Sequence, residues 1–114
     1  MTNTNNEVKR SAQFKDVKSN IDAVAEFLQT VSESSAPQYK SAVRRYLEFT
    51  GDVDVLENIY VSINNLDWYL ESGNFKNEKT KTNQMRYVRS FLMNVIKNNL
   101  DTIEIKKELV LFLL

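Results

Sequence analysis

The chain has 114 residues, which is enough for one domain built around one hydrophobic core. Lys and Arg together number 15, as do Asp and Glu, so the formal net charge is zero, and the chain contains neither Cys nor His. This composition excludes a disulfide framework, a thiolate metal site and a cysteine nucleophile, and it removes the commonest general base and the usual zinc ligands. We therefore expect no catalytic residue, no cofactor and no metal.

The sequence contains no segment typical of a membrane or secretory protein. The longest apolar run, residues 109–114, is far shorter than the roughly 20 residues that a membrane span requires. The first six residues are polar and do not resemble a signal peptide. We expect a cytoplasmic protein with no membrane partner.

Only two glycines and one proline interrupt the chain, which favours helices over a sheet with many turns. We expect an all-α fold, a compact bundle of four or five helices. Residues 1–18 are polar and weakly periodic and predict a flexible N-terminal arm, whereas residues 19–114 predict the helical domain. The apolar spacing places helices at about residues 20–32, 35–50, 62–72, 79–98 and 101–114.

Residues that commonly start or stop helices support these positions. Ser35 is the expected N-cap of the second helix, with Pro37 in its first turn, and Ser62 is the expected N-cap of the third. Gly51 and Gly73 each follow an apolar stretch, where a left-handed C-cap residue is expected. One core is predicted from the apolar faces of the first four helices. Its expected members are Phe27, Leu47, Leu66, Leu70, Val88 and Leu92.

Charge is distributed unevenly along the chain. From Lys76 to Lys97 there are six cations and one acid, whereas from Glu48 to Glu71 there are six acids and no cation. Outside their apolar stripes, the second and fourth helices carry polar side chains that can donate to phosphates and base edges. These are Gln38, Ser41, Arg44 and Arg45 on the second helix, and Thr82, Asn83, Arg86, Arg89 and Ser90 on the fourth. The alternative interpretation is that both are ordinary solvated helix faces.

Several short patterns follow one another in a specific order. They are Phe27-Leu28, Ser34 to Tyr39, Val43, Tyr46-Leu47, Phe49, Leu66 to Leu70, Lys79 to Asn83, Arg86, Val88 and Ser90-Phe91-Leu92. In this order and spacing, residues 19–99 resemble the core-binding domain of tyrosine recombinases and phage integrases. The resemblance implies a SAM-like bundle of four or five helices.

In that family the second and fourth helices contact DNA. The resemblance therefore implies a non-catalytic domain that grips double-stranded DNA with these two helices, as in DNA recombination and integration by phages and mobile elements. It assigns to the DNA the residues Gln38, Ser41, Arg44, Arg45, Lys79, Lys81, Thr82, Asn83, Arg86 and Arg89. The catalytic domain of the recombinases has no counterpart in the sequence. The chain is then either an excised domain or a small stand-alone protein of the same fold.

A single DNA-binding surface requires the two basic helices to present their arginines together. We predict that Arg44, Arg45, Arg86 and Arg89 lie on one side of the bundle, away from the acids of residues 52–57. Spacing supports a shared face within each helix. The common orientation of the two helices comes from the family resemblance.

A second class of function remains open, which is a helical protein-interaction module that uses its acidic surface and its apolar C-terminal helix. Residues 109–114 close the core, dock onto a neighbouring subunit or another partner protein, or belong to a truncated element that led into another domain. Trp68 is expected to be a half-buried anchor, with a partner contact as the alternative. The five tyrosines are expected to pack rather than to act as nucleophiles.

Overall fold

The chain folds into helices joined by short loops, and no strand occurs in the part that the structure describes. This computed structural model describes residues 19–104 and 106–113, so the predicted arm, residues 1–18, lies outside the described residues. A first helical stretch occupies residues 19–28. The helices that follow are α2 (Ala36–Phe49), α3 (Ile59–Ser72), α4 (Glu78–Asn98) and α5 (Lys107–Leu113). The predicted all-α class is confirmed.

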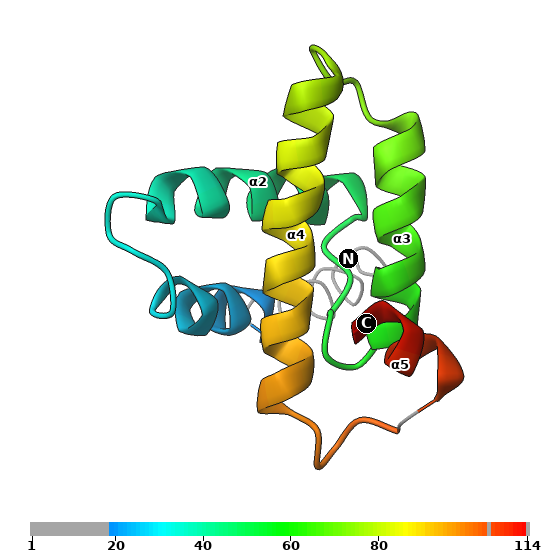
Figure 1. Ribbon diagram of the computed structural model, residues 1–114. Helices are drawn as coiled ribbons and strands as arrows, with labels where there is room; N and C mark the ends of the chain where they lie inside the picture. The colour runs from blue at the N-terminus through cyan, green and yellow to red at the C-terminus, as the bar shows by residue number, and fades with distance from the viewer. Residues whose placement is uncertain (1–18, 105, 114) are drawn as a thin grey trace, which may run out of the picture.

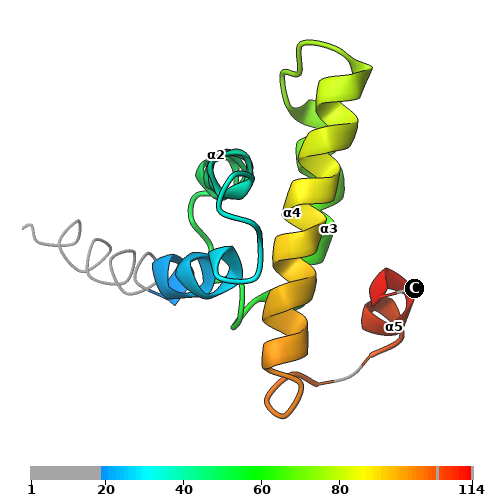
Figure 2. The same ribbon diagram turned by 60° about the vertical axis from the view of Figure 1, so that its left-hand side comes forward.

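Helix α4 is the element around which the others are arranged (Figure 1). It lies beside α3, and α2 crosses behind it; α4 contacts both. Figure 2 shows α2 nearly end-on, with α2 and residues 19–28 on one side of α4 and α5 on the other. The short α5 packs against α3.

The core forms where the apolar faces of these helices meet. In the second half of α4, from residue 88 on, apolar residues at helical spacing are buried and form one stripe that faces the rest of the bundle. The buried residues of this stripe are Val88, Phe91, Leu92, Val95 and Ile96. Five of the six predicted core residues are buried in one cluster, and Leu70, the sixth, is partly buried against it. The prediction of a single core is confirmed.

Helix α3 begins three residues before its predicted start. The carboxylate of Asp54 accepts the backbone N–H groups two and three residues further along, each at 3.0 Å, and this turn leads into the helix at Ile59. Ser62, the predicted N-cap, therefore lies inside α3 and is buried. The prediction was wrong because Asp54, and not a serine, organises the entry to the helix.

Helix α5 begins at Lys107, six residues later than predicted. Residues 99–104 form turns instead, closed by two backbone N–H groups that donate to the carbonyl oxygen of Asn99 at 3.0 and 3.1 Å. Ile103 is buried, so the chain turns inward before the helix starts. Within α5, Leu109 is buried in the core cluster. The C-terminal apolar segment thus contributes to the core.

The two glycines end their helices in different ways. Gly51 follows α2 with a φ of 76°, in the left-handed region, as predicted. Gly73 follows α3 with a φ of −67°, so the predicted left-handed cap is wrong there. Position 73 has no room for a side chain, because a Cβ would lie 2.6 Å from both the carbonyl oxygen of Tyr69 and the ring of Phe75.

Candidate nucleic-acid interface

Helix α4 presents a polar face to solvent along its length. Asn77 fixes the start of the helix, because its side chain accepts the backbone N–H of Thr80 at 2.8 Å. Opposite the buried residues, polar side chains recur at intervals of four, three, four and seven residues, which keeps them on one side of the helix. We call this set the α4 stripe. It consists of Lys79, Asn83, Arg86, Ser90 and Lys97.

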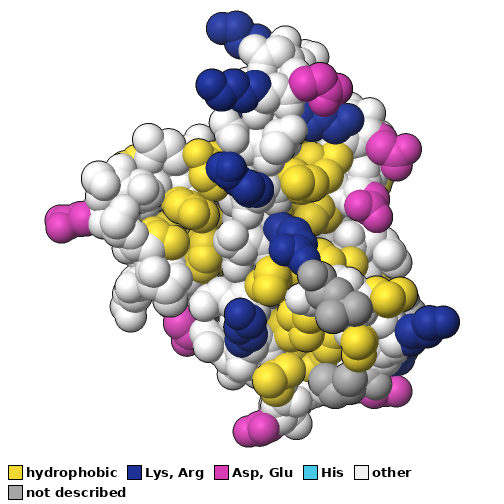
Figure 3. All heavy atoms as spheres, in the orientation of Figure 1, with side chains coloured by type: hydrophobic (Ala, Val, Ile, Leu, Met, Phe, Trp, Pro, Cys, Tyr) yellow, Lys and Arg dark blue, Asp and Glu magenta, His cyan; other side chains and the backbone are white. Residues whose placement is uncertain are grey.

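The α4 stripe is accessible and positively charged. Asn83 is partly buried, and the other four residues are exposed. From Lys79 to Lys97 the stripe is about 27 Å long, given a rise of about 1.5 Å per residue. On the face shown in Figure 3, Lys and Arg side chains follow α4 down the molecule, whereas acidic side chains lie toward the margins. A row of this length spans several successive phosphates of a duplex.

The basic residues of α2 do not join the α4 stripe. Helix α2 packs its buried face toward α4, and the exposed Arg44 lies on another side of α2, whereas the charge of Arg45 acts on Tyr69 of α3. Arg44 lines a groove between α2 and residues 19–28, together with Glu48 and Asp52. The prediction that Arg44 lies away from the acidic stretch is therefore wrong. Because α2 crosses behind α4, Arg44 and the α4 stripe lie on different sides of the bundle.

Arg89 is occupied by a contact within the protein. Its Nη2 donates to the backbone oxygen of Phe112 at 2.7 Å, and its guanidinium carbon lies 5.2 Å from the centre of the Phe112 ring. Arg89 is also partly buried. The sequence predicted a solvent-facing side chain here, whereas the structure places Arg89 between α4 and α5.

The remaining predicted DNA-binding residues lie outside the α4 stripe. On α2, Gln38 and Ser41 are exposed. On α4, Thr82 is exposed and Lys81 is partly buried. Lys97 was missing from the predicted set, although it continues the helical intervals of the α4 stripe and those intervals are visible in the sequence.

Two buried tyrosines have packing roles and unreactive hydroxyls. The Tyr46 hydroxyl donates to the backbone oxygen of Ser62 at 2.6 Å, and burial raises the Tyr46 pKa well above its usual value. Burial also raises the pKa of Tyr69, against the opposing effect of the Arg45 charge. Both hydroxyls stay protonated at neutral pH, which makes them weak nucleophiles.

Residues 19–104 and 106–113 bring together no group of three acidic side chains that could hold a metal ion. Nor does any helix in these ranges have the length and apolar character to cross a membrane. Comparison with protein-family models, curated proteins and solved structures gives no match. The resemblance to the recombinase core-binding domain therefore rests on sequence patterns.

Proposed function

We propose that this protein binds double-stranded DNA through the α4 stripe, without catalysing a reaction. The observation that carries the proposal is the row of Lys79, Arg86 and Lys97 on the exposed side of one 21-residue helix. Cationic side chains on phosphates supply affinity and fix the orientation of the duplex. Asn83 lies between them and has the donor and acceptor needed to pair with an adenine edge.

This proposal keeps the partner that the family resemblance implies but changes the mode of binding. The resemblance assigns DNA contacts to two helices, whereas the proposal assigns them to α4 alone, because Arg44 of α2 lines a groove with Glu48 and Asp52. We further propose that the protein acts in the cytoplasm as a non-catalytic module of recombinase type, from a phage or another mobile element. The order of its helices and aromatic residues supports that origin.

Charge reversal at matched positions tests the proposal. Wild type, Arg86→Glu and Arg44→Glu are titrated with duplex DNA at two or more salt concentrations. Arg86→Glu should weaken binding and reduce the slope of log affinity against log salt by about 0.9 for the lost phosphate contact. Arg44→Glu makes the same change of charge on the opposite side and should bind like wild type. If wild type does not bind at low salt, or both variants bind like wild type, the proposal fails.

A protein-interaction module is the second candidate, and exposed apolar side chains favour it. Trp68 is 52% exposed while its ring lies 4.4 Å from that of Phe49, which fits the predicted half-buried anchor. Val110 and Leu111 on α5 are also exposed. Aromatic and apolar side chains of this kind are common at protein interfaces. Docking through α5 predicts self-association or binding of another protein with no response to duplex DNA.

A further inference from the structure

The contact between Arg89 and Phe112 connects the proposed DNA-binding helix to the last described helix. Arg89 follows Arg86 by three residues, which places it on the flank of the α4 stripe. Its guanidinium donates to the Phe112 carbonyl oxygen and lies over the Phe112 ring. One N–H donor of Arg89 is therefore bound to the Phe112 carbonyl oxygen and is not available to a phosphate oxygen.

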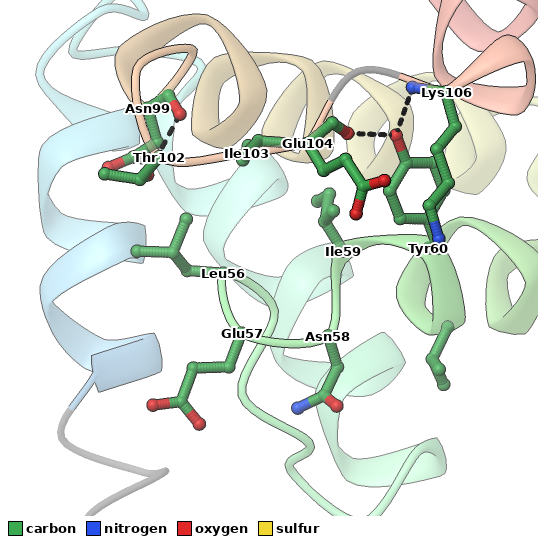
Figure 4. A pocket seen from close by; sticks show the side chains of 11 residues that line it. Leu56, Glu57, Asn58, Ile59, Tyr60, Asn99, Thr102, Ile103, Glu104 and Lys106 are labelled. Carbon is green, nitrogen blue, oxygen red and sulfur yellow. Dashed lines mark hydrogen bonds between the residues drawn. The ribbon is translucent and has the colours of Figure 1, made fainter.

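Two further attachments hold α5 in this position. Leu109 is 0% exposed and belongs to the core cluster. Just before the helix, the Tyr60 hydroxyl donates to the backbone oxygen of Glu104 and accepts the backbone N–H of Lys106 at 2.8 Å (Figure 4). The Lys106 ammonium lies 5.0 Å from the centre of the Tyr60 ring. We call these contacts of Tyr60 the clasp.

A helix of this length depends on such contacts for its stability. It has seven residues, about two turns, and isolated helices shorter than about 12 residues are marginal in water. Val110 and Leu111 are exposed, so their side chains bury little apolar surface against the rest of the protein. Loss of the clasp or of the Leu109 contact should therefore release α5 while the larger helices remain folded.

We propose that α5 masks Arg89, and that release of α5 gives duplex DNA one additional phosphate contact. This inference rests on the proposed function. A phosphate is the stronger acceptor, because its negative charge attracts the guanidinium in addition to the hydrogen bond, whereas the Phe112 carbonyl oxygen carries no net charge. Bound DNA and docked α5 thus compete for the same guanidinium, and the DNA affinity is lower while α5 is docked.

The test releases α5 by point substitution in the full chain. Tyr60→Phe removes the hydroxyl of the clasp and keeps the ring, and Leu109→Ala removes the core contact. Val110→Ala is the matched control, since it truncates an exposed residue of the same helix. Each is made with and without Arg89→Ala, and hydrogen exchange of the α5 amides reports release. Circular dichroism reports whether the bundle is folded; if Leu109→Ala unfolds it, Tyr60→Phe carries the test.

Release should tighten DNA binding and steepen the salt slope by about 0.9, and Arg89→Ala should cancel both changes. In wild type and in Val110→Ala, Arg89→Ala should weaken DNA binding less than it does in the released variants. The inference is overturned if the α5 amides still exchange hydrogen slowly in both Tyr60→Phe and Leu109→Ala. It is also overturned if Arg89→Ala changes the DNA affinity equally in wild type and in these two variants. These failures leave the proposed function intact if Arg86→Glu still weakens binding. If no variant binds DNA, both proposals fall together.

Discussion

The side-chain nitrogen of Asn20 donates to the Oδ1 atom of Asp52 across 2.8 Å, although the two residues are 32 positions apart in the chain. Asn20 is 1% exposed and makes two further hydrogen bonds, to the backbone oxygen of Val53 at 2.9 Å and from the backbone N–H of Val55 at 3.1 Å. Asp52 has a φ of 59°, in the left-handed region that non-glycine residues rarely occupy. One buried amide thus joins the first helical stretch to the loop after α2 and holds that loop in its conformation.

Replacing Asn20 by alanine should therefore destabilise the protein strongly. The buried N–H of Val55 and the partly buried carbonyl oxygen of Val53 would lose their partner, and each buried unsatisfied group costs roughly 1–3 kcal/mol. We expect the free energy of unfolding in urea to fall by at least about 2 kcal/mol. Asp22→Ala, at an exposed position of the same stretch, should change it by less than about 0.5 kcal/mol. Equal effects of the two substitutions would show that the amide network contributes little.

A leucine pair tests the assignment of the buried face of α4. Leu92 is 0% exposed and Leu100, just after the helix, is 49% exposed. Leu92→Ala should lower the free energy of unfolding by roughly 2–5 kcal/mol, because it loses buried apolar surface and leaves a cavity. Leu100→Ala should cost much less. Denaturation of both variants gives the comparison, and a Leu92→Ala effect within about 0.5 kcal/mol would contradict the assignment.

The helices themselves could be predicted because local signals agree along most of the chain. Helix α4 begins one residue before its predicted start and ends where predicted, since its apolar residues recur at helical spacing. Met85 has the same helical spacing as Val88, Leu92 and Val95 but is exposed, whereas Phe91 is fully buried. The spacing of apolar residues thus predicts which face of a helix is buried better than it predicts how deeply each residue on that face is buried.

The candidate site was harder to predict, because it depends on how helices are arranged relative to one another. Spacing shows that Arg44 and Arg86 lie on polar faces of their own helices, but the crossing of α2 behind α4 decides that these faces diverge. The contact between Arg89 and Phe112 joins residues 23 positions apart, so no local pattern reports it. Asn20 illustrates the same point, since nothing in its neighbourhood marks it as a buried polar residue.

Alkaline pH should weaken the fold through Tyr46. Burial raises the pKa of Tyr46 well above its usual value of about 10. Below pH 10 both the folded and the unfolded states keep the proton, so this group adds no pH dependence. Above pH 10 the unfolded state loses the proton and the folded state retains it, so the free energy of unfolding falls by up to about 1.4 kcal/mol per pH unit.

Tyr46→Phe isolates this contribution. At pH 8 the variant should be less stable than wild type by about 0.5–1.5 kcal/mol, because the hydrogen bond to Ser62 is lost. The difference should shrink as the pH rises above 10, since phenylalanine does not titrate. Urea denaturation of both proteins between pH 8 and about pH 11 measures it. A constant difference over this range would contradict the assignment to Tyr46.

We expect different residues of the α4 stripe to determine DNA affinity and sequence preference. Lys79 carries a charge without directional geometry and suits a phosphate, whereas the Asn83 amide can form two hydrogen bonds with adenine. Lys79→Ala should weaken binding to all duplexes alike and lower the salt slope by about 0.9. Asn83→Ala should keep non-specific binding and lose roughly 1–3 kcal/mol of preference at one base pair. Selection from a randomised duplex library, followed by titration of the preferred site and its single-base variants at fixed salt, separates these outcomes. If Asn83→Ala weakens binding to every sequence equally, or wild type shows no preference at all, Asn83 does not read a base, and the stripe holds DNA through its phosphates alone.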